Sequence, residues 1–281
     1  MDLRSFLCNC FTNIDDMASN PLFDLTGRTA LITGGGTGIG SAMALGLAKA
    51  GAKVVLVGRR QAPLDESASA INSELNATMA FAVPGDVMKY DTLDDIVKQA
   101  KELTGKPVTI LINNAGVNVR KPAAELTPDH WKLSLELMLT APFFLARACS
   151  DGFKEEKYGR IICTASLQSY QAFPDSIPYA SAKSGALGLA RALSEYFSPK
   201  YGFENVTCNN IGPGYVKTEL TASVFEDVER AQKLADATIL GRNSVPEDLV
   251  GTAIYLSSNA SSYVTGQTIM VDGGFTSLGL R

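Results

Sequence analysis

The chain of 281 residues has few of the side chains on which metal and triad chemistry usually depend. Its one histidine, His130, excludes a metal site built from several imidazoles and disfavours a Ser-His-Asp triad. The five cysteines include no Cys-x-x-Cys pair, so a zinc knuckle has no support. Their odd number and scatter are typical of reduced thiols. We therefore expect no metal and a cytoplasmic location.

The chain also lacks a basic excess and long apolar runs. Lys and Arg together number 25 against 29 Asp and Glu, whereas nucleic-acid-binding surfaces are usually basic. No segment approaches the roughly 18–20 uninterrupted apolar residues that a membrane-spanning helix needs. Asp2, Asp15 and Asp16 disfavour a signal peptide at the N-terminus. These absences predict neither a nucleic-acid nor a membrane partner.

From residue 29 onward, short apolar runs alternate with longer segments whose apolar residues recur every three or four positions. Continuous apolar strands joined by helix-length crossovers are parallel and buried on both faces. The pattern predicts an α/β fold, a single doubly wound Rossmann-type domain whose seven-stranded parallel sheet has helices on both faces. The strand candidates are residues 30–33, 53–57, 79–83, 109–113, 160–164, 206–210 and 268–271.

No linker or change of composition divides most of the chain. We expect residues 1–22 to form a mobile N-terminal extension and residues 23–281 to form the Rossmann-type domain. Residues 218–244 have a helical pattern but form an insertion between the last two strands. An insertion of this length predicts a lid over a site.

A glycine-rich segment, TGGGTGIG at residues 33–40, joins the first strand to the helical residues 41–50. Glycines allow a tight turn and let the backbone approach a pyrophosphate, and the following helix N-terminus offers free N–H groups to the phosphates. Between a strand and a helix, with a second strand about 20 residues on, the segment predicts a dinucleotide site. The candidate contacts are Gly34, Thr37, Gly38, Ile39 and Gly40.

The end of the second strand indicates which dinucleotide. NAD-binding sheets usually place an acidic residue there, about 20 residues after the loop, on the ribose 2′-hydroxyl. Here Arg59 and Arg60 occupy that place, and the next carboxylate is Asp65. A guanidinium can hold a 2′-phosphate that a carboxylate would repel. We favour NADP(H), with Arg59 on the phosphate, over two merely solvated arginines.

Tyr179 and Lys183 are four residues apart at the start of a helical segment, which places them on one helix face. A free tyrosine has a pKa of about 10 and exchanges protons poorly near neutrality. A nearby ammonium or an oxidised nicotinamide stabilises phenolate and lowers that pKa. The pair fits general acid/base work, although a Tyr-x-x-x-Lys pattern also occurs on ordinary helix surfaces.

Over residues 25–274 the sequence resembles the short-chain dehydrogenase/reductase family. Several ordered motifs carry the resemblance and are more specific together than any one alone. Besides the glycine-rich segment and the Tyr-Lys pair, they are Asp86-Val87 after the third strand, Asn113-Asn114-Ala115-Gly116 after the fourth, Ser166 after the fifth, Pro213-Gly214 after the sixth, and Val271-Asp272-Gly273-Gly274 near the end.

The resemblance implies a role for each matching residue. Tyr179 would be the general acid/base, Ser166 would hydrogen-bond the substrate oxygen, and Lys183 would lower the tyrosine pKa and bind the nicotinamide ribose. Family members are usually homodimers or homotetramers, built through the helices that carry Trp131 and Tyr179 and through the C-terminal strand. The implied coenzyme contacts are Asp86 and Val87 at adenine, Asn114, Ala115 and Gly116 at the adenine-side ribose, and Pro213, Gly214, Val216 and Thr218 at the nicotinamide end.

One position departs from the family pattern. Met138 stands seven residues after Trp131, where the family usually has an asparagine that helps hold a proton-relay water. A thioether cannot replace the amide. Either water reaches Lys183 from another polar group, or turnover is slow, or the protein is a non-catalytic NADP-binding sensor or scaffold. We favour the first, because the Ser-Tyr-Lys set is complete.

The substrate is expected to lie among residues 117–121, 167–173 and 218–244, which mix polar and aromatic side chains. Several hydrogen-bonding groups beside the reacting carbonyl favour a small hydroxylated carbonyl/alcohol substrate, such as a keto-sugar, sugar acid or polyol, over a steroid or long acyl chain. The segment LTGRTALITGGGTGIG is similar to sugar-acid and polyol dehydrogenases of the gluconate 5-dehydrogenase type. The alternative is a 3-oxoacyl carrier-protein reductase.

Overall fold

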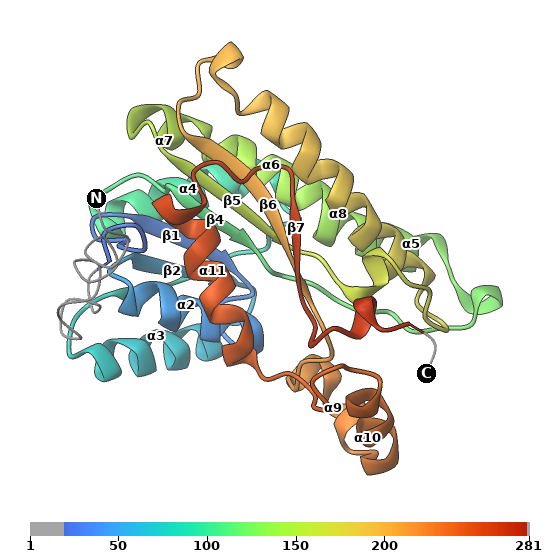
Figure 1. Ribbon diagram of the computed structural model, residues 1–281. Helices are drawn as coiled ribbons and strands as arrows, with labels where there is room; N and C mark the ends of the chain where they lie inside the picture. Colours follow the sequence, from blue (N-terminus) through green and yellow to red (C-terminus); the bar gives the residue numbers. More distant parts are fainter. Residues whose placement is uncertain (1–19, 280–281) are drawn as a thin grey trace, which may run out of the picture.

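Seven parallel strands form the centre of the computed structural model, which describes residues 20–279 (Figure 1). All seven predicted strands are confirmed, and β6 continues to Pro213, beyond the predicted residue 210. The strands are β1 (Thr29–Thr33), β2 (Lys53–Gly58), β3 (Ala80–Pro84), β4 (Ile110–Asn113), β5 (Gly159–Thr164), β6 (Val206–Pro213) and β7 (Thr268–Val271).

The order of the strands in the sheet is β3-β2-β1-β4-β5-β6-β7, and every neighbouring pair is parallel. The chain therefore winds outward in one direction from β1 and in the other from β4. Crossover connections leave a crevice at the carboxyl ends of the strands where the direction changes, and ligands of such sheets bind there. The topology confirms the predicted doubly wound Rossmann-type architecture.

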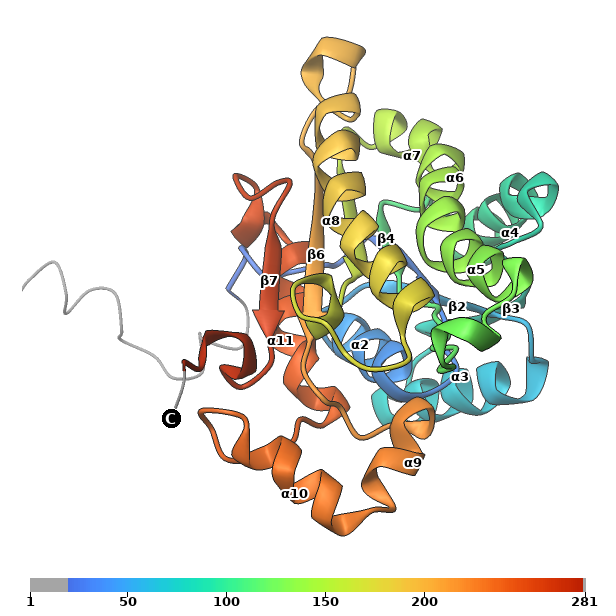
Figure 2. The same cartoon turned by 90° about the vertical axis from the view of Figure 1, so that its right-hand side faces the viewer.

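Helices cover both faces of the sheet (Figures 1 and 2). Alternate residues of a strand point to opposite faces, so Ile32 joins the core beneath one helical layer while Leu31 joins the core beneath the other. The first layer consists of α2 (Gly38–Lys49), α3 (Gln61–Leu75) and α11 (Val250–Ser257). The second consists of α4 (Leu93–Thr104), α5 (Pro128–Leu135), α6 (Ala141–Ala148), α7 (Ser150–Glu155) and α8 (Ile177–Tyr196).

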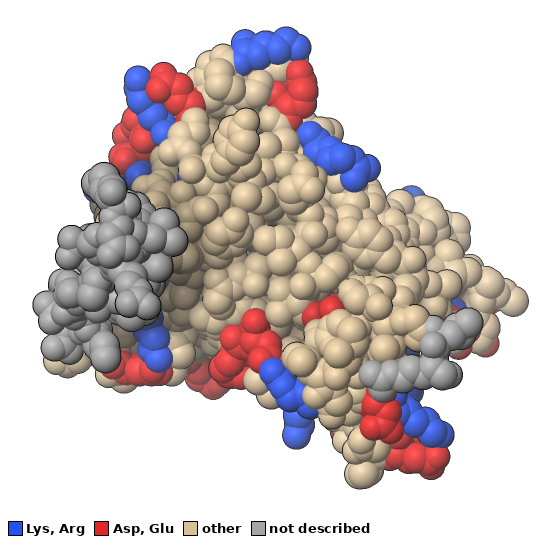
Figure 3. Space-filling view, viewed as in Figure 1, with Lys and Arg blue, Asp and Glu red and all other residues tan. Residues whose placement is uncertain are grey.

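The insertion between β6 and β7 is helical, as the sequence pattern predicted. It contains α9 (Ala222–Phe225) and α10 (Val228–Asp236), which project from the body of the domain below the end of β6 in Figure 1. The space-filling view shows charged side chains of both signs around the margin of the face that bears β7 and few over its centre (Figure 3).

The predicted N-terminal extension, residues 1–22, lies outside the described residues except for its last three. Within residues 20–279, no helix has the length and apolar character that crossing a membrane requires. The same residues contain no group of three or more His, Cys, Asp or Glu side chains placed to hold a metal ion.

Candidate active site

Three adjoining cavities form a crevice along the carboxyl ends of the strands. The first two share Gly34, Thr37, Ala115 and Gly116, and so continue into one another. The middle cavity and the third share Ser166 and Tyr179 among other residues. One continuous site thus runs from the end of β2 to the insertion that follows β6.

The glycine-rich turn occupies the centre of this crevice. Gly34 has φ +66°, in the left-handed region, and a Cβ there would lie 3.0 Å from the Asn114 Nδ2 atom. Thr33 Oγ1 accepts hydrogen bonds of 3.0 Å from the backbone N–H groups of Asn114 and Ala115, which fixes the loop after β4 against the turn. The N-terminus of α2 begins at Gly38 and lines the same cavity, an arrangement suited to phosphate.

Every residue predicted to contact a coenzyme lines the first two cavities except Gly40. Gly40 is buried, and a Cβ on it would overlap the carbonyl oxygen of Gly34. It therefore lets the first turn of α2 pack against the glycine-rich turn. Its place in the structure is that of a packing residue beneath the crevice.

The two arginines at the end of β2 are exposed and line the first cavity together with Asp86 and Val87. The Arg60 Nη2 atom lies 3.8 Å from Glu219 Oε2, so this guanidinium reaches across the crevice to the start of the insertion. Arg59 has no ion-pair partner among the described residues within 4.0 Å. It is therefore the more available cation at the place where a 2′-phosphate is expected.

Ser166, Tyr179 and Lys183 meet around the middle cavity. Ser166 follows β5 and caps the 3₁₀ turn Leu167–Ser169, its Oγ atom accepting a 3.1 Å hydrogen bond from the Gln168 backbone N–H. Tyr179 lies in the first turn of α8, directly after Pro178. Lys183 lies one turn further, with its Nζ atom 5.7 Å from the centre of the Tyr179 ring. The Nζ atom donates a hydrogen bond to the Thr164 carbonyl.

Burial perturbs both titrating members of this set. Desolvation raises the pKa of Tyr179, while a hydrogen bond to Ser166 and the positive charge of Arg120 act in the opposite direction. Desolvation lowers the pKa of Lys183 to about 8. The amine therefore loses its proton before the phenol does in the ligand-free protein. Near neutrality the site holds a protonated tyrosine and an ammonium, which is the state needed to donate a proton.

The third cavity, about 400 Å³ in volume, lies beyond Ser166 and Tyr179. Phe173 and Tyr215 form one wall, with ring centres 5.9 Å apart. Tyr215 was not predicted from the sequence, although it directly follows the Pro213-Gly214 motif. The remaining lining includes a cation, two amides and the start of the insertion: Arg120, Asn118, Gln168, Leu220, Thr221, Ser223 and Val224.

Met138 lies beside the crevice without lining any of its three cavities. It is 4% exposed and belongs to a π-helical turn, Glu136–Thr140, between α5 and α6. A Cβ on Gly116 would lie 3.4 Å from the Met138 sulfur, so the thioether packs beneath the loop that follows β4. Here it is a core side chain, and no relay through it is apparent.

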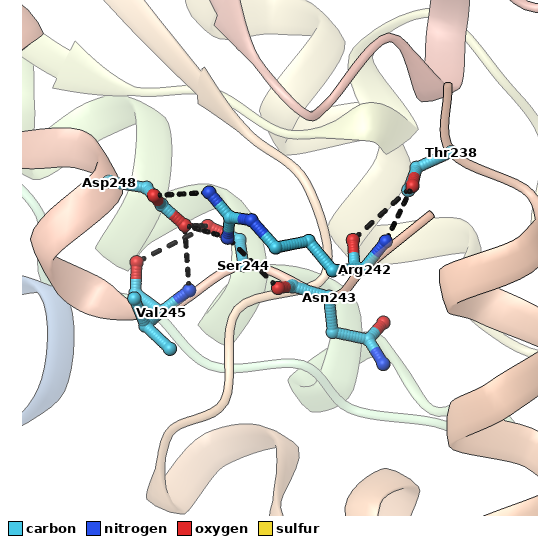
Figure 4. A network of polar contacts seen from close by, with 6 residues as sticks. All are labelled: Thr238, Arg242, Asn243, Ser244, Val245 and Asp248. Atoms are coloured by element: carbon cyan, nitrogen blue, oxygen red, sulfur yellow. Dashed lines mark hydrogen bonds and ion pairs between the residues drawn. The ribbon is translucent and has the colours of Figure 1, made fainter. Parts of the chain in front are cut away.

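The insertion is closed at its base by a polar network (Figure 4). Arg242 donates two hydrogen bonds, of 2.7 and 2.8 Å, to the Asp248 carboxylate, which also accepts from Ser244 Oγ and the Val245 N–H. The guanidinium holds the pKa of Asp248 well below its usual range. Backbone hydrogen bonds between Ser244 and residues 215 and 217 complete the base.

The fold and this arrangement of side chains define a dinucleotide-binding oxidoreductase of the short-chain type. A family model described as enoyl-(acyl carrier protein) reductase matches residues 34–276. The chain belongs to the short-chain dehydrogenase/reductase family.

Among particular relatives, the chain is 38% identical over 261 residues to a gluconate 5-dehydrogenase from Gluconobacter oxydans, covering 92% of this chain and 99% of that protein. It is 32% identical over 255 residues to a 5-keto-D-gluconate 5-reductase from Escherichia coli, covering 91% and 98%. The crystal structure of a gluconate 5-dehydrogenase from Burkholderia cenocepacia in complex with NADP and tartrate has a TM-score of 0.83 and 33% identity, covering 92% of this chain and 98% of that one.

Proposed function

We propose that this protein is an NADP(H)-dependent oxidoreductase that interconverts a carbonyl and a secondary alcohol in a small hydroxylated acid, with 5-keto-D-gluconate as the candidate substrate. The observation that carries the proposal is that Ser166, Tyr179 and Lys183 surround one cavity that continues into the crevice formed by the glycine-rich turn. The activities named for the relatives from Gluconobacter oxydans and Escherichia coli support the same reaction.

The crevice fits NADP(H). Gly34 lets the glycine-rich turn pack against the loop after β4, the N-terminus of α2 faces the crevice, and Arg59 supplies a cation where the 2′-phosphate is expected. The relative from Burkholderia cenocepacia was crystallised with NADP. When bound, the coenzyme supplies or accepts the hydride. The chain's own residues position the substrate and move the proton.

The three catalytic side chains divide the proton chemistry. Ser166 Oγ accepts the Gln168 N–H and forms a hydrogen bond with Tyr179, so its hydroxyl can turn to donate to a substrate oxygen bound beside both side chains. Tyr179 gives its proton to that oxygen during reduction and takes it back during oxidation. The Lys183 ammonium stabilises the phenolate and would exchange the Thr164 carbonyl for the hydroxyls of the nicotinamide ribose.

The third cavity supports the choice of an acidic, hydroxylated substrate. Arg120 is exposed at its edge and is close enough for its charge to lower the pKa of Tyr179. A substrate carboxylate can pair with this guanidinium while the carbon chain lies against Phe173 and Tyr215. Tartrate, the hydroxy acid in the relative's crystal, belongs to the same chemical class as the proposed substrate.

The decisive experiment measures NADPH oxidation with 5-keto-D-gluconate and NADP⁺ reduction with gluconate. We expect turnover in both directions, and a loss of about 10²–10⁴-fold in kcat for Tyr179→Phe with NADPH affinity retained. Exclusive activity on an acetoacetyl thioester would instead identify a 3-oxoacyl carrier-protein reductase. If wild type and Tyr179→Phe are equally inactive on a broad panel of carbonyl compounds, the result would identify a sensor or scaffold.

Substitutions of the two neighbouring arginines test the preference for NADPH over NADH. Arg59→Ser should raise the KM for NADPH about 10- to 100-fold and leave the KM for NADH nearly unchanged, because only NADPH carries the 2′-phosphate. Arg60→Ser is the matched control, since Arg60 faces Glu219. Equal effects of Arg59→Ser on both coenzymes would refute the assignment of the phosphate to Arg59.

We also propose a homodimer or homotetramer located in the cytoplasm. Trp131 on α5 and Phe143 on α6 are 42% and 40% exposed, and β7 is an edge strand whose residues are all partly exposed. Such surfaces suit subunit contacts. Light scattering on the purified protein counts the subunits. Cys149, Cys163 and Cys208 are buried and form no disulfide, which fits a reducing compartment, and cell fractionation tests the location.

A further inference from the structure

The amide of Gln168 is a buried polar group with an unfilled hydrogen-bonding capacity beside the reacting centre. Gln168 is 7% exposed and lines the third cavity. Its Oε1 atom is buried and has no hydrogen-bond partner among the described residues. Its Nε2 atom donates no hydrogen bond within residues 20–279. Among those residues, only the backbone N–H and carbonyl of Gln168 form hydrogen bonds.

The backbone around this amide is firmly placed. The Gln168 N–H donates to Ser166 Oγ, Ser184 Oγ donates to the Gln168 carbonyl at 3.4 Å, and Ser169 Oγ donates to the Lys183 carbonyl at 2.7 Å. The 3₁₀ turn is thereby docked on the same helix that carries Tyr179. The Gln168 side chain therefore lines the same cavity as Ser166 and Tyr179.

An unpartnered buried amide is unfavourable, since the group has lost its water without gaining another partner. An apolar side chain of similar size would avoid that loss. A second amide has the same property: the Oδ1 atom of Asn118, on the loop after β4, is buried and unpartnered and its residue lines the same cavity. Both residues line the same cavity, so rotation of either terminal torsion brings its amide to a ligand bound there.

We infer that Gln168 is a specificity-determining residue that hydrogen-bonds a hydroxyl group on a carbon adjacent to the reacting carbonyl, with Asn118 contacting a hydroxyl further along the chain. This inference rests on the proposed function and narrows its substrates to α-hydroxy ketones. The terminal torsion of glutamine is broad, so the amide can present either its oxygen or its nitrogen to the ligand. A hydroxyl can accept from one and donate to the other.

A buried amide that needs a substrate hydroxyl would make the site reject acyl thioesters. A 3-oxoacyl chain carries no hydroxyl on either carbon next to its ketone, and binding it would leave the Gln168 amide desolvated and unpaired. Sites built to hydrogen-bond a substrate hydroxyl discriminate strongly against analogues that lack it. Discrimination by the buried amide therefore acts in addition to any contact with Arg120.

The test combines a substitution of Gln168 with the removal of single hydroxyl groups from the substrate. kcat/KM is measured for wild type and Gln168→Met with 5-keto-D-gluconate and with its 4-deoxy and 6-deoxy analogues, which lack one of the hydroxyls flanking the carbonyl. We expect Gln168→Met to lower kcat/KM about 10- to 100-fold for 5-keto-D-gluconate and for one deoxy analogue. The other analogue, which lacks the contacted hydroxyl, should be a poor substrate for both proteins and change less than about threefold.

Controls separate specificity from structural damage. Gln267→Met is the matched control. It removes an exposed amide that lies just before β7, at the end of the sheet away from the crevice, and donates to the Thr265 carbonyl. This change should leave all of the rates unaltered. If Gln168→Met does not fold, Asn118→Leu is measured in the same way. Equal losses on all three substrates, with the substrate ratio unchanged, would overturn the inference and show that the amide only supports the turn.

Failure of the role assigned to Gln168 can be distinguished from failure of the proposed function. If wild type does not reduce 5-keto-D-gluconate at all, the proposed substrate is wrong, and the same comparison is made with acetoin and 2-butanone. These two ketones differ in one α-hydroxyl and carry no carboxylate. A wild-type preference for acetoin that Gln168→Met abolishes would still support the inference, whereas a preference that the variant keeps would refute it.

Discussion

Removing the Lys183 charge gives the sharpest prediction for the proton chemistry. At 5.7 Å from the Tyr179 ring, and with an effective dielectric constant of about 20, the ammonium stabilises a phenolate by about 3 kcal/mol. That energy corresponds to a factor on the order of 100 in rate wherever the phenolate is the reacting form. Lys183→Met should therefore lower kcat/KM for gluconate oxidation about 100-fold near neutrality.

The size of that loss should depend on pH, because burial lowers the pKa of Lys183 to about 8. Below pH 8 the wild-type amine is charged and the full difference between the two proteins is present. Above pH 8 wild type itself loses the charge, so the ratio of wild type to variant should fall. A neutral lysine can still bind the ribose, and that part of the loss stays constant.

The assay is a pH series of kcat/KM for gluconate, which reports the titrating groups of the free enzyme. Lys217→Met, which removes an exposed lysine beside the insertion, is the control and should follow wild type throughout. A ratio of wild type to Lys183→Met that stays the same from about pH 6 to pH 10 would refute the electrostatic reasoning and leave Lys183 as a ribose ligand alone.

Three other substitutions test the structure around the site. Gly40→Ala should destabilise the protein by about 1–3 kcal/mol and weaken NADPH binding, because the added methyl overlaps the Gly34 carbonyl; unchanged thermal unfolding and binding would contradict this packing. Asp248→Asn should lower the melting temperature by about 2–4 °C through the partly exposed pair with Arg242. Since the folded pKa of Asp248 is lowered, that stability is present above about pH 4 and disappears as the pH falls; a difference that persists in acid would exclude the charge as its source. Met138→Leu should keep kcat within about twofold, because the thioether packs in the core; a large drop in kcat with normal stability would show that the sulfur takes part in turnover.

Much of the architecture could be predicted because it depends on local properties of the chain. Strands such as β1 and β4 are continuous apolar runs, and that pattern alone indicates burial on both faces. The glycine-rich turn was recognisable because only glycine readily adopts the φ of +66° found at Gly34. The spacing of Tyr179 and Lys183 on one helix face follows from helix geometry.

Other features of the site depend on what surrounds a residue in space. The sequence marks Gly40 as part of the motif, but only the packed turn shows that its hydrogen faces the Gly34 carbonyl and not the crevice. The lowered pKa of Lys183 comes from burial, which no spacing encodes. Met138 stood out as a departure from the family pattern, and its place in a π-helical turn became visible only in the fold.

The sequence by itself determined the class of fold, and it marked the glycine-rich turn and the one-turn spacing of Tyr179 and Lys183, because period, turn chemistry and helix spacing are short-range. The tertiary structure alone decided what lies around that pair. It brought Arg120, Gln168 and Tyr215 from three separate loops to one cavity, and it left an amide there without a partner. Contacts between residues far apart in the chain depend on how the crossovers pack on the sheet, and local pattern does not specify them.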